Sequence, residues 1–416
     1  MNILKNNTIY AALDIGSSKI VCIVGKYNNN EEMEILGYEY KSTKSVKKGQ
    51  VMDSSNIGDE IKKVVNSAGK KTNTEISSVI VNANALNSKS IFLKGTTEIN
   101  GDQIDDLHIK SAINNSGIYD YSEEYKSLHE VINHFDTDNE KKIINPKNLY
   151  ANKLSANIYQ IIIKKNYFKS IENILSDVNL NIEYLIASPF ASSLSTLIKD
   201  EKEMGTICID LGAGITSVCI IENNSLIFAG GISVGSNNIT YDIASGLTTE
   251  IESAERLKTL YGSVFSNPSD EYEIIDVPVI GHEKNQFNQI NRSHLNSFIK
   301  PRVEETLELV RQKLKEHNLH NKKYRRVVLT GGGSLLEGID EFAKIIFGSQ
   351  VRIAYPSNIL GLEDNIYKPQ FSTAVGSLLV GRENQLEISD FFPEKGDKIN
   401  KKGIFRRFYR WLDHYI

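Results

Sequence analysis

Residues that could bind a phosphate group lie between the first two apolar runs of the chain, 10–13 and 20–24. Two apolar runs joined by a short polar segment predict a β-hairpin. A tight turn of glycine and serine presents backbone N–H groups to an anion, and hydroxyl and ammonium groups add hydrogen bonds and charge. An acidic residue would repel a bare phosphate, which indicates a bridging cation such as Mg²⁺. An ordinary hairpin turn without a ligand is the alternative for this segment taken alone. The turn comprises Asp14, Gly16, Ser17, Ser18 and Lys19.

The same pattern recurs in the second half of the chain. The apolar run 206–211 contains Asp210 and leads through a glycine turn into the run 217–221. Two such hairpins, half a chain apart, predict a duplicated α/β lobe with a ligand bound between the copies. The second turn comprises Gly212, Ala213 and Gly214.

A third glycine turn follows the apolar run 326–330 and precedes a predicted helix at 335–346. The N-terminal amides of that helix would then face an anion or a ribose. The glycine spacing is not that of a dinucleotide fingerprint. This turn comprises Gly331, Gly332, Gly333 and Ser334.

Together these segments resemble the FtsA family of bacterial cell-division proteins, within the actin-like ATPase superfamily. The segments that carry the likeness are 14–19, 329–334, 371–376 and a C-terminal helix at 403–416. The resemblance implies an α/β fold of two actin-like lobes, a duplicated ribonuclease H-like unit, with an FtsA-type extra subdomain. It also implies that ATP and Mg²⁺ are bound between the lobes.

The resemblance assigns a role to each turn. Asp14 and Asp210 would be the catalytic residues and would hold Mg²⁺ through water. The first turn would meet the β-phosphate, the second the γ-phosphate, and the third the adenosine and α-phosphate. Glu255 and Lys258 would contact the ribose and base, and an i,i+3 ion pair in solvent is the alternative for them.

Hydrolysis has weaker support in the sequence. Many relatives carry a Gln or Glu in the first helix that crosses between the lobes, where this chain has the segment 187–194. The polar groups of that segment are Ser188, Ser192 and Ser193. Serine is a poor general base without a partner. We therefore expect ATP binding with weak or conditional turnover, with ATP acting mainly as a conformational ligand.

The chain divides into several predicted units. The first lobe takes 1–83, 165–193 and 372–381, the second takes 194–242 and 294–371, and further units occupy 84–164 (extra subdomain), 243–293 (small subdomain), 382–402 (linker) and 403–416 (amphipathic helix). Short strands are predicted at 90–93 and 141–146. A long helix is predicted at 301–317, with Pro301 in its first turn.

Composition restricts the class of protein. The chain has 416 residues, enough for two lobes. Its net charge is −4, so no overall basic character argues for nucleic acid as a partner. Three cysteines in apolar runs fit a reducing compartment. No signal peptide or transmembrane run is expected.

Two other classes of ATPase are less consistent with the sequence. A sugar kinase would need a substrate-activating aspartate, and a heat-shock chaperone would need a large substrate domain after the ATPase.

The resemblance also implies partners. We expect the chain to recruit FtsZ, to tether the FtsZ ring to the cytoplasmic membrane, and to help recruit other divisome proteins. We also expect it to polymerise into protofilaments, with the extra subdomain contacting neighbours. The C-terminal peptide of FtsZ would bind near 243–293 and the adjoining Lys300, Pro301 and Arg302. An adaptor of the PilM type in pilus assembly, which has a similar fold, is the alternative function.

The C-terminal segment 403–416 predicts an amphipathic helix by its residue spacing. Apolar residues fall on one arc and Arg406, Arg407, Arg410, Asp413 and His414 on the other. Such a helix is too short to span a bilayer and suits an anionic membrane surface. We therefore predict a peripheral membrane protein, and the resemblance implies that it lies on the cytoplasmic face of the inner membrane, at the division septum. A helix docked on the protein's own core is the alternative. The apolar arc comprises Ile404, Phe405, Phe408, Tyr409, Trp411, Leu412, Tyr415 and Ile416.

Overall fold

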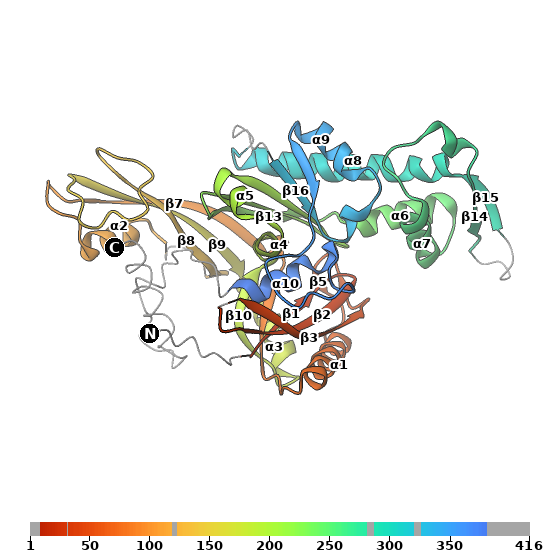
Figure 1. The fold of residues 1–416 in the computed structure, drawn as a ribbon, viewed down its shortest axis with the longest axis horizontal. Coiled ribbons are helices and arrows are strands. Elements are labelled where there is room, and N and C mark those ends of the chain that lie inside the picture. Colours follow the sequence, from red (N-terminus) through yellow and green to blue (C-terminus); the bar gives the residue numbers. More distant parts are fainter. Residues whose placement is uncertain (1–8, 31, 119–122, 281–286, 320–325, 381–416) are drawn as a thin grey trace.

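Two five-stranded sheets of the same topology form the centre of the protein (Figure 1). The computed structural model describes residues 9–30, 32–118, 123–280, 287–319 and 326–380. In each sheet, three consecutive antiparallel strands are followed in sequence by two strands parallel to the first. This repeat confirms the predicted duplication.

Both sheets place the first strand of their hairpin at the centre. In spatial order, the first sheet comprises β10 (Asn181–Ala187), β6 (Ser78–Ala83), β1 (Ile9–Ile15), β2 (Lys19–Tyr27) and β3 (Met33–Ser42). The second comprises β13 (Ser225–Ile232), β12 (Thr216–Glu222), β11 (Thr206–Leu211), β16 (Arg326–Thr330) and β17 (Gln350–Ile353). We call these sheets, with the helices packed on them, the first and second lobes.

Helices cover both faces of each sheet (Figure 1). The outer face of the first sheet packs on α1 (Ser54–Thr72) and α3 (Lys165–Ser176), and that of the second on α8 (Arg292–Glu316) and α9 (Ile339–Phe347). Between the two sheets lie α4 (Ser188–Thr196) and α10 (Ser372–Leu379). Because strands with two buried faces read as continuous apolar runs, both hairpins are visible in the sequence.

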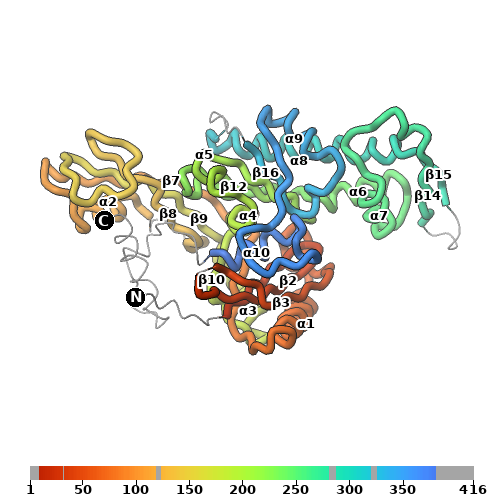
Figure 2. The backbone as a smooth tube through the Cα atoms, viewed as in Figure 1, coloured from red at the N-terminus to blue at the C-terminus, as the bar shows by residue number. Residues whose placement is uncertain are grey.

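The extra subdomain is a separate arm with its own core. Its sheet has the order β7 (Ser88–Glu98), β9 (Lys153–Lys164), β8 (Tyr125–Thr137), covered by α2 (Asp106–Asn114). Figure 2 shows the chain leaving the first lobe for this arm and returning to the first lobe before it enters the second. The predicted strand at 90–93 is part of the longer β7. The predicted strand at 141–146 is wrong, because Ile143 forms only an isolated bridge to Phe135.

Two helices and a hairpin form the opposite end of the molecule (Figure 1). They are α6 (Ser236–Leu247), α7 (Ile251–Tyr261), β14 (Ile274–Pro278) and β15 (Phe287–Asn291). The remaining short elements are β4 (Val46–Lys47), β5 (Gln50–Val51), α5 (Lys199–Met204) and four 3₁₀ turns, η1 (Ala85–Asn87), η2 (Pro268–Glu271), η3 (Gly332–Leu335) and η4 (Pro369–Phe371).

Two predicted helix starts are wrong. The long helix α8 begins at Arg292, where the Asn291 side chain accepts a hydrogen bond from the His294 backbone N–H, so Pro301 lies inside the helix. Proline favours a helix start because it lacks an N–H, and inside a helix it removes one backbone hydrogen bond. In α8 the buried contacts of the helix outweigh that loss. The third glycine turn opens η3, and the α-helix after it begins at Ile339.

Several predictions concern residues outside the described part of the chain. The linker at 382–402 and the amphipathic helix at 403–416 both lie there. Among the residues that the structure describes, no helix is long and apolar enough to cross a membrane. The other subdomain boundaries stay predictions.

Candidate nucleotide site

The first turn joins β1 to β2 and is anchored by a side chain from β6. Gly16 closes the turn with a 3.0 Å hydrogen bond from its N–H to the Lys19 carbonyl oxygen. Asn82 accepts a 2.9 Å hydrogen bond from the Ile15 N–H and donates a 3.0 Å bond to the Ser188 hydroxyl on α4. The predicted hairpin therefore forms, and Asn82 ties it to a helix that lies between the sheets.

Asp210, near the end of β11 and just before the second turn, lies between a hydroxyl and a bare backbone. The Thr373 hydroxyl of α10 donates a 2.9 Å hydrogen bond to Asp210 Oδ2. On the other side, a Cβ atom at Gly331 would overlap Asp210 Oδ1, and Gly331 has a φ of 81°, which glycine adopts most easily. The third turn thus lies directly against the end of β11.

The first and second turns also meet each other. A Cβ atom at Gly214 would lie 2.5 Å from the Ser17 hydroxyl oxygen and 3.0 Å from the Lys48 backbone nitrogen. The Gly49 N–H donates a 3.1 Å hydrogen bond to the same hydroxyl oxygen. The short β4–β5 hairpin therefore joins the two candidate phosphate turns.

The two aspartates and Lys19 form one electrostatic unit. Burial raises the pKa of Asp14 to about 6; the Lys19 ammonium opposes this rise and the Asp210 carboxylate adds to it. Burial also raises the pKa of Asp210, opposed by the Thr373 hydrogen bond and by Lys19. Burial lowers the pKa of Lys19, opposed by both carboxylates. Two carboxylates around one ammonium leave an excess negative charge that suits a further cation.

The polar side chain of the third turn forms a hydrogen bond within the turn itself. The Ser334 hydroxyl is buried and donates a 2.7 Å hydrogen bond to the Gly331 carbonyl oxygen. Gly332 has room, because a Cβ atom there would meet only the Gln370 Cβ, at 3.6 Å. Gly333 is tighter, because a Cβ atom there would lie 3.0 Å from atoms of Leu211. The turn can offer a ligand backbone atoms rather than the serine hydroxyl.

The Glu255–Lys258 pair forms and is tied to the second turn. The Lys258 ammonium lies 2.6 Å from the Glu255 carboxylate and donates to the Thr240 hydroxyl and the Ser236 carbonyl oxygen. The Ser236 N–H donates in turn to the Gly212 carbonyl oxygen at 2.9 Å. Lys258 is buried, so this is not a simple solvated pair, although its predicted contact with a ribose and base stays a prediction.

The donor set fits a nucleotide-bound cation better than a protein cage. Within the described residues, no group of three metal-ligating acidic, histidine or cysteine side chains occurs. Mg²⁺ usually keeps several waters and is held by one or two carboxylates together with phosphate oxygens. Asp14 and Asp210 match that requirement.

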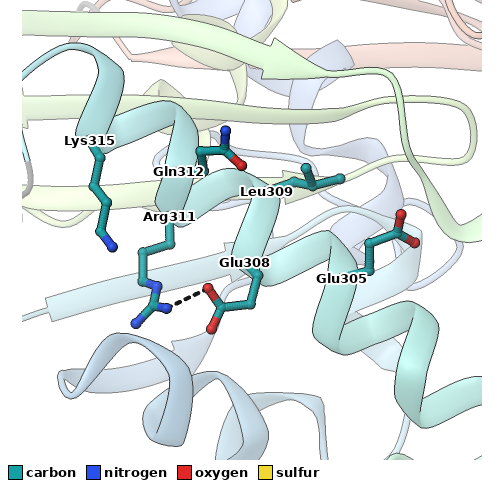
Figure 3. A pocket seen from close by; sticks show the side chains of 6 residues that line it. All are labelled: Glu305, Glu308, Leu309, Arg311, Gln312 and Lys315. Atoms are coloured by element: carbon teal, nitrogen blue, oxygen red, sulfur yellow. Dashed lines mark ion pairs between the residues drawn. The ribbon is translucent and has the colours of Figure 1, made fainter.

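Two depressions on the described part of the surface lack the predicted site residues. One of about 370 Å³ is lined only by residues of α8, where Arg311 pairs with Glu308 at 2.6 Å (Figure 3). Another of about 680 Å³ lies along β10, the start of β8 and α3. Neither contains a residue of the three turns.

Three features of the site were missed in the sequence. They are Asn82, Thr373 and the turn at Lys48 and Gly49. A polar residue at the end of a buried strand was a usable signal for Asn82. A hydroxyl in the first turn of an otherwise apolar helix was the corresponding signal for Thr373.

Comparison with known proteins decides the family. A family model described as "Cell division protein FtsA" matches residues 207–376. The FtsA protein of Agrobacterium fabrum is 31% identical over 423 residues, covering 98% of this chain and 95% of the relative. The chain belongs to the FtsA family of cell division proteins. The FtsA protein of Rhizobium meliloti is 30% identical, with the same coverage.

Solved structures with lower identity show the same fold. A type IV pilus biogenesis complex of PilM and PilN contains a chain with a TM-score of 0.61 and 15% identity, over 89% of this chain and 97% of that one. The MreB5 protein of Spiroplasma citri, bound to ADP, has a TM-score of 0.56 and 13% identity, over 90% and 96%. These neighbours confirm the actin-like fold. The full-length relatives favour cell division over the pilus-assembly alternative.

Proposed function

We propose that the chain binds ATP with Mg²⁺ where the Asp14 turn, the Asp210 turn and Gly331 meet. The observation that carries this proposal is the pair of carboxylates around Lys19, bordered by glycine turns in which a Cβ atom would clash. Such an arrangement costs free energy without a ligand, because buried charge is poorly solvated. A phosphate-bound cation would offset that cost.

The residues of the chain have distinct tasks in this proposal. The Gly49 N–H occupies a lone pair of the Ser17 hydroxyl, which leaves its hydrogen free to meet a phosphate oxygen. Lys19 supplies a positive charge, and Asp14 and Asp210 would hold Mg²⁺ through water. Bound Mg·ATP supplies the phosphates and the divalent charge. Turnover is expected to be weak, because Ser188 donates its hydroxyl hydrogen to the Ala83 carbonyl oxygen.

Nucleotide binding is tested with a fluorescent ATP analogue. Asp210→Ala should abolish binding. Gly332→Asp adds a carboxylate where a side chain fits, so it should weaken binding through charge, by at least about tenfold relative to Gly332→Asn, its uncharged match. Unchanged affinity in both Asp210→Ala and Gly332→Asp would sink the site assignment.

The chain is further proposed to bind FtsZ through the small subdomain. The β14–β15 hairpin exposes apolar side chains, and Tyr272 beside it is 85% exposed. Arg302 is held between Asp242 and Glu305, so its charge is already engaged. We therefore expect the exposed apolar residues to contribute more than Arg302. The exposed apolar residues are Tyr272, Ile274 and Phe287.

Binding to the C-terminal peptide of FtsZ tests this surface. A double variant Tyr272→Ser with Ile274→Ser should lose the peptide in a pull-down, because both side chains are exposed and their loss spares the core. Leu107→Ser, an exposed apolar residue of the arm, serves as the matched control. Equal capture by the parent chain and both variants would place the contact elsewhere.

Tethering of the FtsZ ring would also require polymers of this chain and a contact with the membrane. We propose that protofilaments form through contacts that include the arm, and that the helix at 403–416 lies on anionic lipid at the septum, where other divisome proteins assemble. Electron microscopy on lipid with ATP should show filaments. Truncation after residue 402 should release the protein from anionic vesicles without loss of ATP binding. A Trp411 emission that stays unshifted on such vesicles would refute the membrane contact.

A further inference from the structure

Both oxygens of the Asp210 carboxylate are restrained by named neighbours. Oδ2 accepts the 2.9 Å hydrogen bond from the Thr373 hydroxyl, and Oδ1 faces the bare Cα of Gly331. Thr373 is the second residue of α10, while Asp210 lies at the end of β11. The contact therefore links a helix between the sheets to the predicted metal-binding residue of the second lobe.

The other hydroxyls of α10 are used differently. The Ser377 hydroxyl donates a 2.9 Å hydrogen bond to the Thr373 carbonyl oxygen, which is ordinary back-bonding within a helix. The Ser372 hydroxyl lies 2.7 Å from the Thr330 hydroxyl. Thr373 instead directs its hydroxyl away from the helix to a carboxylate. A hydrogen bond to an ionised group is among the stronger ones in proteins.

The helix that carries Thr373 is fixed in place. A Cβ atom at Gly376 would overlap the Ala191 carbonyl oxygen, so α10 and α4 cross in backbone contact. In close-packed interiors such a crossing leaves little freedom to slide. Phe371, just before α10, also lies under Lys19, with its ring centroid 4.9 Å from the ammonium. The Thr373 hydroxyl therefore stands at a defined place relative to both lobes.

We propose that Thr373 is a positioning residue that holds the Asp210 carboxylate in the orientation in which it meets a Mg²⁺-bound nucleotide. The proposal rests on the proposed function of this site. Pre-organised groups avoid reorganisation when the ligand arrives. Thr373 does not itself need to touch the nucleotide, and its effect should be seen in the dependence of binding on Mg²⁺.

The test compares four full-length proteins in the binding of a fluorescent ATP analogue across a range of Mg²⁺ concentrations. Thr373→Val keeps the branched shape and removes the hydroxyl, Thr373→Ser keeps the hydroxyl, and Ser377→Ala removes a hydroxyl from the same helix away from Asp210. We expect Thr373→Val to need about tenfold more Mg²⁺ for half-maximal binding, as for a lost hydrogen bond to a charge. Thr373→Ser and Ser377→Ala should stay within about twofold of the parent chain.

The outcomes separate this inference from the proposed function. Analogue binding measured in EDTA should be equal in all four proteins, because only the Mg²⁺-dependent part is affected. If the parent chain shows no Mg²⁺-dependent binding, the proposed function fails and the inference fails with it. If the parent binds and Thr373→Val has the same Mg²⁺ dependence, the inference alone is overturned. Thr373→Ala replaces Thr373→Val if the latter melts at a lower temperature than the parent.

Discussion

Asp14 should lower the stability of the nucleotide-free chain at neutral pH. Its side chain is buried, with 9% exposed, and burial raises its pKa from 3.8 to about 6. A carboxyl with a raised pKa binds more protons when folded than when unfolded between those two values, so stability falls as pH rises through that window. At 1.36 kcal/mol per pKa unit, the full cost above pH 6 is about 3 kcal/mol.

Asp14→Asn removes this cost because it cannot ionise. The variant should gain about 3 kcal/mol over the parent at pH 7.5 and about 1 kcal/mol at pH 4.5, where the folded parent is mostly protonated. For a chain of this size, about 3 kcal/mol corresponds to about 3–4 °C in Tm. Thermal melts of the full chain without nucleotide, at both pH values, measure the difference. Asp59→Asn, at an exposed position of α1, controls for the loss of one charge.

Mg·ATP should make the parent chain more stable than Asp14→Asn. The parent should gain Tm on adding Mg·ATP, since a ligand that binds only the folded state stabilises it, whereas Asp14→Asn should gain little. A variant no more stable than the parent at pH 7.5 would refute the reasoning. So would a gain of the same size at pH 4.5, because then ionisation would not be its cause.

Three further substitutions test the frame around the site. Gly376→Ala should lower Tm strongly, because the new Cβ atom would overlap the backbone of α4, at a cost of about 1–3 kcal/mol or more in the free energy of unfolding. Gly58→Ala in α1 is the control, because a Cβ atom has room there and the change should be neutral or stabilising in the same melts. Arg352→Ala should lower the free energy of unfolding, measured in urea, by about 3 kcal/mol, because it breaks the bidentate hydrogen bond to the buried Glu201 carboxylate. Adding Glu201→Gln to that variant should recover part of the loss, because it removes the unpaired buried charge. Gly331→Ala should abolish binding of the ATP analogue, because its Cβ would displace the second aspartate.

The fold was largely readable from the sequence because its strands are buried on both faces. Continuous apolar runs, interrupted by Asp-x-Gly turns, repeat in the same order in both halves and predict both sheets. Helix starts were harder. The side-chain cap at Asn291 and the buried Leu295 set the start of α8 well before Pro301, and only tertiary packing makes an internal proline tolerable there.

The three turns and a ligand between the lobes were predicted from the sequence, but the side-chain contacts that join the turns were not. The Thr373 hydrogen bond to Asp210 joins residues 163 positions apart, and the Asn82 bond to Ser188 joins residues 106 apart. Neither contact has a periodic signal, because each depends on how a helix crosses between two sheets. The approach of Ser17 to Gly214 likewise follows from the packing of two lobes, each of which only specifies its own hairpin.

If Mg·ATP binds as proposed, the positions of the two aspartates would give it a conformational role through electrostatics. Asp14 belongs to the first lobe and Asp210 to the second, and the Asp210 charge raises the pKa of Asp14 further, beyond the larger effect of burial. The carboxylates therefore repel each other across the junction of the lobes, and Lys19 offsets only part of that repulsion. A divalent cation bound between them would turn the repulsion into attraction to a shared charge and favour the arrangement in which the turns touch. Loss of the cation with the spent nucleotide would restore the repulsion, so we expect lobe closure to follow nucleotide occupancy even where hydrolysis is slow.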